Sequence, residues 1–456
     1  MFDRIAWLII VNLALYMKTL RYKFVSDDFS VWRNPPVAKN WRHKIWLQLT
    51  GQMKIYEKSI RFAYADKKLY MAIIRSEEYE HLLTIFIHIG ICISIYFAFG
   101  ASWISFVTAL LYSVNAANNQ GTIWPSGRGF ALPILFLVLS LAIPLLSPLF
   151  LFCGTWYTAG FLAPLSLIGS AKWFILGSMP IIWFIHSRKF TKAVKNKQKT
   201  ECFDEDRKMH PRKVILAIKT FGFYFLLCLF PYRITFYHNF LQSSAGSMRH
   251  KNYTLCRYFW IGAITMAAMI WYGCTHPWDK FIWALVAFMV TILPFCNFIR
   301  ANQEIAERFV ALPNVFLMYA LAQVIWPYPI IVTAFVVFYA TRSFYTLIMY
   351  KDEYYITELA IIEDPHAWWA WHCRAMKRWD TQSYKEALIL WVMAKMISPK
   401  EFKVLMNIAT CLRLLKNDKE ADQYLALAEQ NIVAGQEKEA MSMIADHRRG
   451  KLPILL

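Results

Sequence analysis

Long apolar runs separated by short polar segments fill the first 350 residues of the chain. A helix needs about 20 mostly apolar residues to cross a bilayer, and runs near that length recur about eleven times. The pattern predicts an all-α fold, a polytopic membrane helical bundle in residues 1–350. The predicted spans are Ile5–Leu20, His81–Phe99, Trp103–Asn118, Phe130–Leu146, Leu149–Ile168, Trp173–Ile185, Val214–Pro231, Tyr258–Cys274, Phe281–Phe298, Pro313–Trp326 and Ile330–Tyr350.

The first run admits two interpretations. Arg4 precedes it, as a basic residue precedes a secretory signal, but Arg21, Tyr22 and Lys23 follow it, where a cleavage site needs small residues. We interpret the run as an uncleaved first helix, with a signal peptide as the alternative.

The charge of the loops predicts an orientation. Loop 187–213 carries ten Lys/Arg against four acids, so the positive-inside rule predicts that it is cytoplasmic. Counting spans from it places loop 21–80 and everything after Tyr350 outside. Loop 21–80 is itself rich in Lys and Arg, which opposes this orientation, but its length lies at the limit where the rule applies.

Residues 351–456 have a charged, helix-forming composition without a spanning run. Small residues and a proline stand at the offsets of a tetratricopeptide helix pair, and a 34-residue step leads to a second, less regular set. The pattern predicts two TPR-like repeats on the external side; the alternative is a plain α-hairpin. The residues concerned are Trp371, Ala375, Ala387, Ala394 and Pro399, followed by Ala409, Ala421 and Ala428.

The composition agrees with a membrane protein. Hydrophobic residues make up 57% and charged residues 18% of 456, which excludes a disordered or collagen-like chain. A net charge of +20 fits anionic lipids and lipid-linked substrates, and we rank nucleic acid last as a partner. The nine cysteines lie far apart and predict neither a disulfide framework nor a metal site.

Three polar groups are candidates for chemistry. The pair Asp27-Asp28 follows the first span, where one carboxylate could act as a general base; an Asp pair at a helix end also serves as a cap. Arg128 is the last residue of the sequence Trp-Pro-Ser-Gly-Arg, and its guanidinium could bind a phosphate through two parallel hydrogen bonds. The alternative is that its side chain extends to a lipid headgroup at the membrane surface. Glu307 and Arg308 precede a span and could form an ion pair. The span count places all three groups on one face.

These motifs, in this order, resemble a family. Four further short motifs accompany them along the chain: His-Leu-Leu-x-x-x-x-His (His81 to His88), Leu-Tyr-Ser-Val, a Phe-Pro-Tyr-Arg-Ile-Thr-Phe-Tyr stretch (Phe230–Tyr237) and Ala-Glu-Arg-Phe-x-x-Leu-Pro (Ala306–Pro313). Together they resemble the transmembrane-and-TPR O-mannosyltransferases and their bacterial relatives, in the GT-C class of polyprenyl-phosphate-dependent glycosyltransferases. The chain departs from relatives at Asn115-Ala116, where they often have His-Pro, and it lacks their Arg-Pro-Leu.

The resemblance implies a GT-C fold and assigns roles to the candidate residues. Asp27 and Asp28 would be the catalytic acids of the first external loop, while Arg128, Arg308 and Glu307 would bind the donor phosphate. The implied reaction moves a sugar from a polyprenyl-phosphate donor to a hydroxyl, such as Ser or Thr of an exported protein. The implied location is a bacterial inner membrane with a periplasmic site, or an endoplasmic reticulum membrane with a luminal one.

Two other functions remain open. A catalytically inactive membrane scaffold would keep the fold and bind a partner protein through its repeats, which the missing motifs favour. A transporter would be expected to have ionisable groups in mid-span, whereas the acids here cluster at one face. No cofactor is identified: the sequence has no nucleotide-binding glycine motif, and an Asp dipeptide alone is a thin set of ligands for a divalent metal.

Overall fold

The computed structural model confirms the all-helical class. It describes residues 1–25, 77–147, 149–150, 212–236, 238, 254–297, 305–432 and 437–450. These residues contain sixteen α-helices and no β-strand. The chain divides into two compact units, which are described separately: unit 1 comprises residues 1–194, 217–234 and 255–352, and unit 2 comprises 195–216, 235–254 and 353–456.

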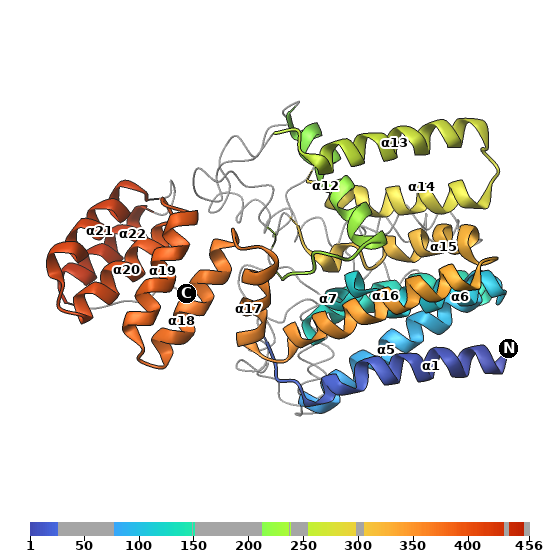
Figure 1. Cartoon of the computed structure of the whole chain (residues 1–456), viewed down its shortest axis with the longest axis horizontal. Helices are drawn as coiled ribbons and strands as arrows, with labels where there is room; N and C mark the ends of the chain where they lie inside the picture. Colours follow the sequence, from blue (N-terminus) through green and yellow to red (C-terminus); the bar gives the residue numbers. More distant parts are fainter. Residues whose placement is uncertain are drawn as a thin grey trace. The chain divides into compact units, whose positions relative to one another are not determined.

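Unit 1 is a bundle of roughly antiparallel helices (Figure 1). Nine of the eleven predicted spans correspond to these helices. Of the other two, Trp173–Ile185 lies wholly outside the described residues, and Leu149–Ile168 lies outside them apart from Leu149 and Phe150. Loop 187–213 is also almost wholly outside them. The helices are α1 (Phe2–Tyr16), α5 (Glu77–Ala98), α6 (Trp103–Val114), α7 (Asn119–Thr122), α8 (Arg128–Ala142), α12 (Arg212–Leu229, which belongs to unit 1 from Ala217 on), α13 (Arg257–Thr275), α14 (Lys280–Ile292), α15 (Pro313–Ile325) and α16 (Pro329–Leu347).

Local sequence explains where several of these helices begin. Ser102 forms a capping box with Ser105 at the start of α6, and the Asp279 side chain accepts from the Phe281 amide at the start of α14. Proline is the first residue of α15 and α16, where its missing N–H would have no helical partner. The hydrophobic runs therefore become helices whose ends are set by ordinary capping chemistry.

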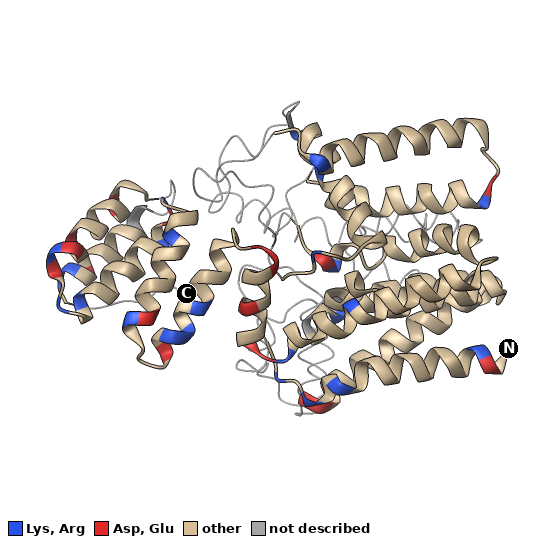
Figure 2. Cartoon of the chain, viewed as in Figure 1, with Lys and Arg blue, Asp and Glu red and all other residues tan. Residues whose placement is uncertain are grey.

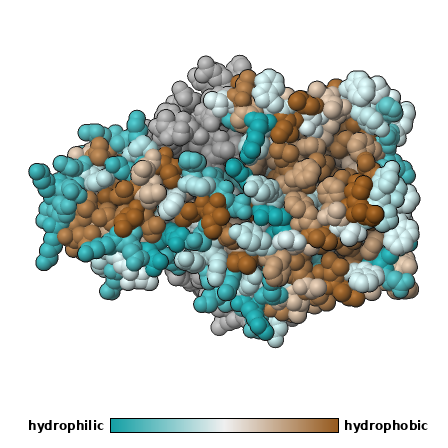
Figure 3. Space-filling view, in the orientation of Figure 1, coloured by the Kyte–Doolittle hydropathy of each residue, from teal (hydrophilic) through white to brown (hydrophobic). Residues whose placement is uncertain are grey.

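The outer surface of unit 1 is unusually apolar. Charged residues lie almost entirely at the helix ends (Figure 2), and hydrophobic residues cover much of the visible surface over this unit (Figure 3). By length and composition two helical segments, Glu77–Ala98 and Pro329–Tyr350, could cross a membrane, and four shorter helices are also apolar. The larger number of spans remains a prediction. Large side chains more than half exposed include Trp7, Phe86, Trp103, Trp260, Ile264, Trp271, Trp278, Trp283, Ile330, Val337 and Phe344.

Unit 2 contains α17 (Glu353–Glu363), α18 (Trp368–Asp380), α19 (Tyr384–Ile397), α20 (Phe402–Leu414), α21 (Asp418–Gln430) and α22 (Glu437–Arg448). Consecutive helices pack as hairpins (Figure 1). The six predicted alanines, Ala375, Ala387, Ala394, Ala409, Ala421 and Ala428, are fully buried. Small side chains thus stand where neighbouring helices approach, and the assignment to tetratricopeptide repeats stays a prediction.

A histidine in α22, His447, lies in surroundings that disfavour its protonated form. The His447 side chain is fully buried, and neither ring nitrogen has a hydrogen-bond partner within the described part of the chain. Burial, assisted by the Arg413 cation and opposed by Asp422, lowers the pKa of His447 below its ordinary value. The unfolded chain therefore binds this proton more readily than the folded one, so protonation favours unfolding.

We expect unit 2 to be most stable above the ordinary histidine pKa and to lose stability as the pH falls below about 6.5. The loss can reach about 1.4 kcal/mol per pH unit until the lowered, folded-state pKa is passed. Thermal unfolding of the full chain at pH 7.5 and pH 5 measures it. His447→Phe should reduce this dependence, and an unchanged pH profile in that variant would assign the acid sensitivity to other groups.

Candidate functional site

One end of unit 1, here called the polar end, gathers most of the predicted site. α5, α8 and α15 begin there and α16 ends there, whereas the turns α5–α6, α13–α14 and α15–α16 lie at the opposite end, near the N-terminus (Figure 1). The polar end comprises residues 18–25, 77–81, 115–128, 305–312 and 348–351.

Asp27 and Asp28 lie outside the described residues, but the segment before them is fixed at the polar end. The Lys23 amide donates to the Lys351 carbonyl at 3.0 Å, and the Phe24 amide donates to Glu77 Oε1 at 3.3 Å. Phe24 and Val25 are buried. The segment that carries Asp27 and Asp28 therefore begins at the polar end, where Arg128, Glu307 and Arg308 also lie.

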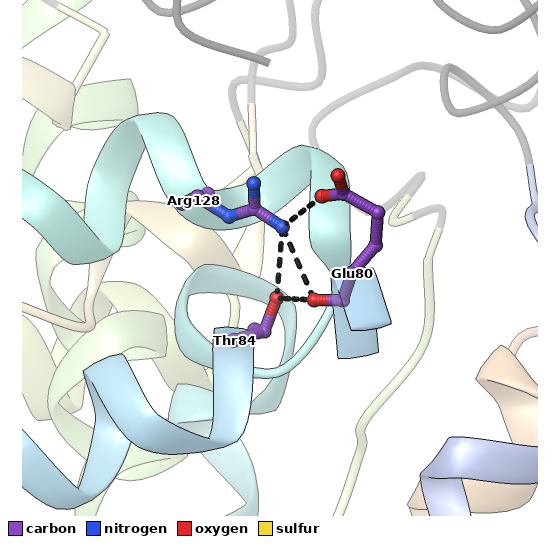
Figure 4. Close-up of polar contacts among 3 residues, drawn as sticks. All are labelled: Glu80, Thr84 and Arg128. Atoms are coloured by element: carbon purple, nitrogen blue, oxygen red, sulfur yellow. Dashed lines mark hydrogen bonds and ion pairs between the residues drawn. The ribbon is translucent and has the colours of Figure 1, made fainter. Parts of the chain in front are cut away.

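Arg128 is held in a buried ion pair. Its Nη2 donates to Glu80 Oε2 at 2.5 Å, to the Glu80 carbonyl at 3.1 Å and to Thr84 Oγ1 at 3.3 Å (Figure 4). The side chains of Arg128 and Glu80 are only 1% and 2% exposed. Arg128, at the start of α8, is thus tied to the first turns of α5, and a carboxylate already neutralises much of the charge predicted to meet a phosphate.

Two glycines let the loop before Arg128 pack this closely. A Cβ on Gly127 would lie 2.1 Å from the Gln120 carbonyl oxygen, and one on Gly121 would lie 2.7 Å from Ala311 Cβ. Both distances are too short for any larger residue. The glycine of Trp-Pro-Ser-Gly-Arg is therefore required for the backbone to fold back on α7, which in turn lies against the segment after Arg308.

Glu307 and Arg308 lie in a short 3₁₀ turn, Glu307–Phe309. The Arg308 amide donates to Gln120 Oε1 at 2.9 Å, which joins this turn to the loop that ends at Arg128. The Arg308 guanidinium lies over the rings of Phe130 and Phe309, at 5.6 and 5.2 Å from their centroids. Glu307 is fully buried, whereas Arg308 is half-buried. Of the two predicted arginines, Arg308 is therefore the more accessible cation.

The first residues of the Phe230–Tyr237 motif have a structural role at the end of α12, and Tyr237 lies outside the described residues. Pro231 stops the helix, and side chains from α16 and from the turn after α6 donate to the carbonyls left without helical partners. Asn115 Nδ2 donates to the Cys228 carbonyl at 2.7 Å, Tyr339 Oη to the Leu229 carbonyl at 2.9 Å, and Arg342 Nε to the Pro231 carbonyl at 3.1 Å. Arg342 also donates to the Tyr232 carbonyl. Such capping allows irregular backbone inside an apolar bundle.

Sequence reasoning missed Glu80 and Gln120. Three acids, Glu77, Glu78 and Glu80, open α5, and only Glu80 is buried. A signal was present, because Glu80 and Thr84 are four residues apart and so share one helix face. Nothing in the sequence pairs that face with Arg128. Within the described residues, no group of three or more His, Cys, Asp and Glu side chains could hold a metal ion.

No protein-family model, curated protein or solved structure matches this chain. The resemblance stated above therefore rests on the short motifs alone, and the function must be argued from the site.

Proposed function

We propose that this chain is a membrane-embedded glycosyltransferase of the GT-C class, which transfers a sugar from a polyprenyl-phosphate donor to a hydroxyl of an exported protein. The proposal is carried by one observation: Gln120 joins the loop ending at Arg128 to the Glu307–Arg308 turn, at the end of unit 1 from which the chain continues to Asp27-Asp28. Residues far apart in sequence, and predicted for one reaction, thus belong to one end of one bundle.

The apolar surface of unit 1 supports a location in the membrane. Exposed tryptophans concentrate at the end opposite the polar end, as in the aromatic belts of membrane proteins. A soluble monomer rarely exposes this much apolar surface. Two helical segments are long and apolar enough to cross a membrane, and we propose that the other predicted spans cross it too, giving a bundle of about eleven spans. In this proposal the TPR-like repeats lie on the catalytic side of the membrane. The tryptophans at that end are Trp7, Trp103, Trp271, Trp278, Trp283 and Trp326, whereas the exposed Trp260 lies in the first turn of α13.

The surroundings of the two arginines support different roles for them in the proposed reaction. Arg308, half-buried and flanked by two phenyl rings, is suited to charge developing on the leaving lipid phosphate, which is the role of an anion site in group transfer. Arg128 acts through position, because Glu80 holds its guanidinium. Asp27 or Asp28 would take the proton from the attacking hydroxyl. The donor is already activated, so no nucleotide site is required.

Transfer assays with purified chain, a polyprenyl-phosphate sugar and a Ser/Thr peptide test this proposal. Arg308→Ala should lower kcat/KM about 10²-fold or more, and Arg308→Lys should recover part of it because the charge remains. Asp27→Asn and Asp28→Asn, made separately, should leave the fold intact, and at least one should abolish transfer. Arg4→Ala is the matched control, since Arg4 lies over the Trp103 ring at 4.0 Å at the opposite end.

A scaffold without catalysis is the second candidate, and the Glu80–Arg128 pair favours it, because that pair removes one cation from the proposed donor site. Equal glycosylation of acceptors by the wild type and by both Asp variants would refute the catalytic assignment. A partner protein retained by unit 2 under those conditions would then support the scaffold.

A further inference from the structure

Helix α19 of unit 2 is apolar on two opposite faces. One face is fully buried in the core of the unit and consists of Ala387, Trp391 and Ala394. The other face, here called the α19 stripe, consists of Ile389, Met393 and Met396, which are 63%, 36% and 72% exposed. Residues spaced by four and three positions share one side of an α-helix. Unit 2 therefore leaves one whole apolar side of α19 uncovered.

The α19 stripe differs from the equivalent surface one hairpin later. α21 begins 34 residues after α19, and its exposed positions include Asp418, Asp422 and Gln423. Polar residues on the outer face of a stacked helix keep such a unit soluble. Three large apolar side chains on one face, in contrast, form a patch of the kind that marks an interaction surface.

Lysines stand at both ends of the α19 stripe. Lys385 lies one turn before Ile389, Lys400 follows the end of the helix, and both are exposed. The one acid of α19, Glu386, is bound by Arg378 at 3.0 Å. Residues 368–403 contain seven Lys/Arg against three acids, whereas residues 418–448 contain three against seven. The stripe therefore belongs to the basic part of unit 2, and its surroundings are complementary to an anionic partner.

We propose that the α19 stripe docks on the surface of an anionic lipid bilayer. An apolar helix face flanked by lysines is typical of helices that lie in the membrane interface, where the apolar side chains reach the acyl chains and the lysines extend to headgroup phosphates. A bilayer offers both layers to a single face. Pairing of the stripe with a second copy of this chain would instead bring its lysines together.

The connection between the two units supports this partner. Unit 1 ends at Asp352 and unit 2 continues from Glu353, so the chain keeps unit 2 within reach of any membrane that holds unit 1. The inference rests on the proposed membrane location of unit 1 and does not depend on glycosyl transfer.

Electron paramagnetic resonance of the full chain in nanodiscs with anionic lipid tests the proposal. A nitroxide at Met393, introduced as a genetically encoded amino acid, leaves the nine native cysteines in place. It should collide often with oxygen, which concentrates in lipid, and rarely with a water-soluble nickel chelate. The ratio of the two collision rates should be several-fold higher than at Gln423, the exposed control on α21. Equal ratios would overturn the proposal, and so would few collisions with both reagents, which would show that protein covers the stripe.

Removal of the flanking lysines tests the preference for anionic lipid. One lysine near an anionic surface strengthens binding about fivefold, so Lys385→Gln/Lys400→Gln should lower the docking equilibrium about 30-fold. Lys416→Gln/Lys419→Gln, at the exposed α20–α21 turn, is the matched control and should leave the collision ratio at position 393 unchanged. The same ratio in nanodiscs made only of neutral lipid would refute the role of anionic headgroups.

A nitroxide at Ile264 separates this inference from the proposed membrane location. Ile264 is 66% exposed on α13 of unit 1, so it should contact lipid whether or not unit 2 docks. Lipid contact at position 264 together with water contact at position 393 would refute the docking of α19 alone. Water contact at position 264 would refute the membrane location on which the inference rests.

Discussion

Glu80→Gln is expected to destabilise unit 1 by about 3–5 kcal/mol, because it leaves the Arg128 cation buried without its carboxylate. The pair is almost completely excluded from solvent, so water cannot replace the lost partner. The double variant Glu80→Leu/Arg128→Met should recover most of this stability, since a well-packed apolar pair of similar volume avoids the desolvation of two charges. Denaturant unfolding of the chain in mixed micelles measures all three proteins.

The exposed pair Arg413–Asp422 provides the control. Its side chains are 21% and 64% exposed, and Asp422→Asn should cost no more than about 1 kcal/mol.

If the folded Glu80→Leu/Arg128→Met variant still transfers sugar, Arg128 does not bind the donor phosphate directly. A small cost for Glu80→Gln would contradict the buried ion pair itself.

Gly222→Ala and Gly262→Ala are each expected to cost at least about 3 kcal/mol, at the upper end of the range for overpacking. α12 and α13 cross at these residues with their backbones in direct contact. A Cβ on Gly222 would lie 2.0 Å from the Tyr258 carbonyl oxygen, and one on Gly262 would lie 2.2 Å from the Ile218 carbonyl oxygen. Close approach through small residues is typical of helix pairs in membranes, and the helices would have to separate.

Gly90→Ala is the matched control for this crossing. Gly90 is also within a helix, but its added Cβ would meet Leu135 Cδ1 at an ordinary 3.5 Å, so the substitution should be neutral or stabilising through helix propensity. Fluorescence-detected size-exclusion after graded heating compares the three variants. Equal melting of Gly222→Ala and Gly90→Ala would show that α12 and α13 do not cross as described.

The fold was largely predictable because hydrophobic periodicity is a local property. Span Tyr258–Cys274 was predicted within a residue of α13, Arg257–Thr275. Helix ends were less accurate where an irregular turn follows: the span predicted to end at Asn118 ends as an α-helix at Val114, and Asn115 turns the chain. Uncharged polar residues such as Asn115, whose side chain accepts a hydrogen bond from the backbone of a turn, do not interrupt an apolar run in the sequence. The predicted span therefore continues past the true end of the helix.

The partners of the site residues could not be predicted in the same way. Glu80 and Arg128 are 48 residues apart, and Gln120 and Arg308 are 188 apart. Only tertiary packing brings such pairs together, and the sequence contains no local pattern that encodes it. The sequence predicted Arg128 to bind the donor phosphate, from its loop alone, whereas the structure shows its guanidinium in a buried ion pair with Glu80. For Asp27 and Asp28, the prediction stands untested by the described residues.

The side-chain cap on α12 has a consequence for biosynthesis. Arg342 and Pro231 are 111 residues apart, and Tyr339 and Leu229 are 110 apart. At a translation rate of roughly 5–20 residues per second, α12 exists for about 6–20 s before the helix that caps its end emerges from the ribosome. In the proposed membrane location, the Leu229, Pro231 and Tyr232 carbonyls need water, lipid headgroups or an insertion chaperone as partners during that interval. A truncated chain that stops before Tyr339 should therefore be retained by the insertion machinery, whereas one that includes Arg342 should be released.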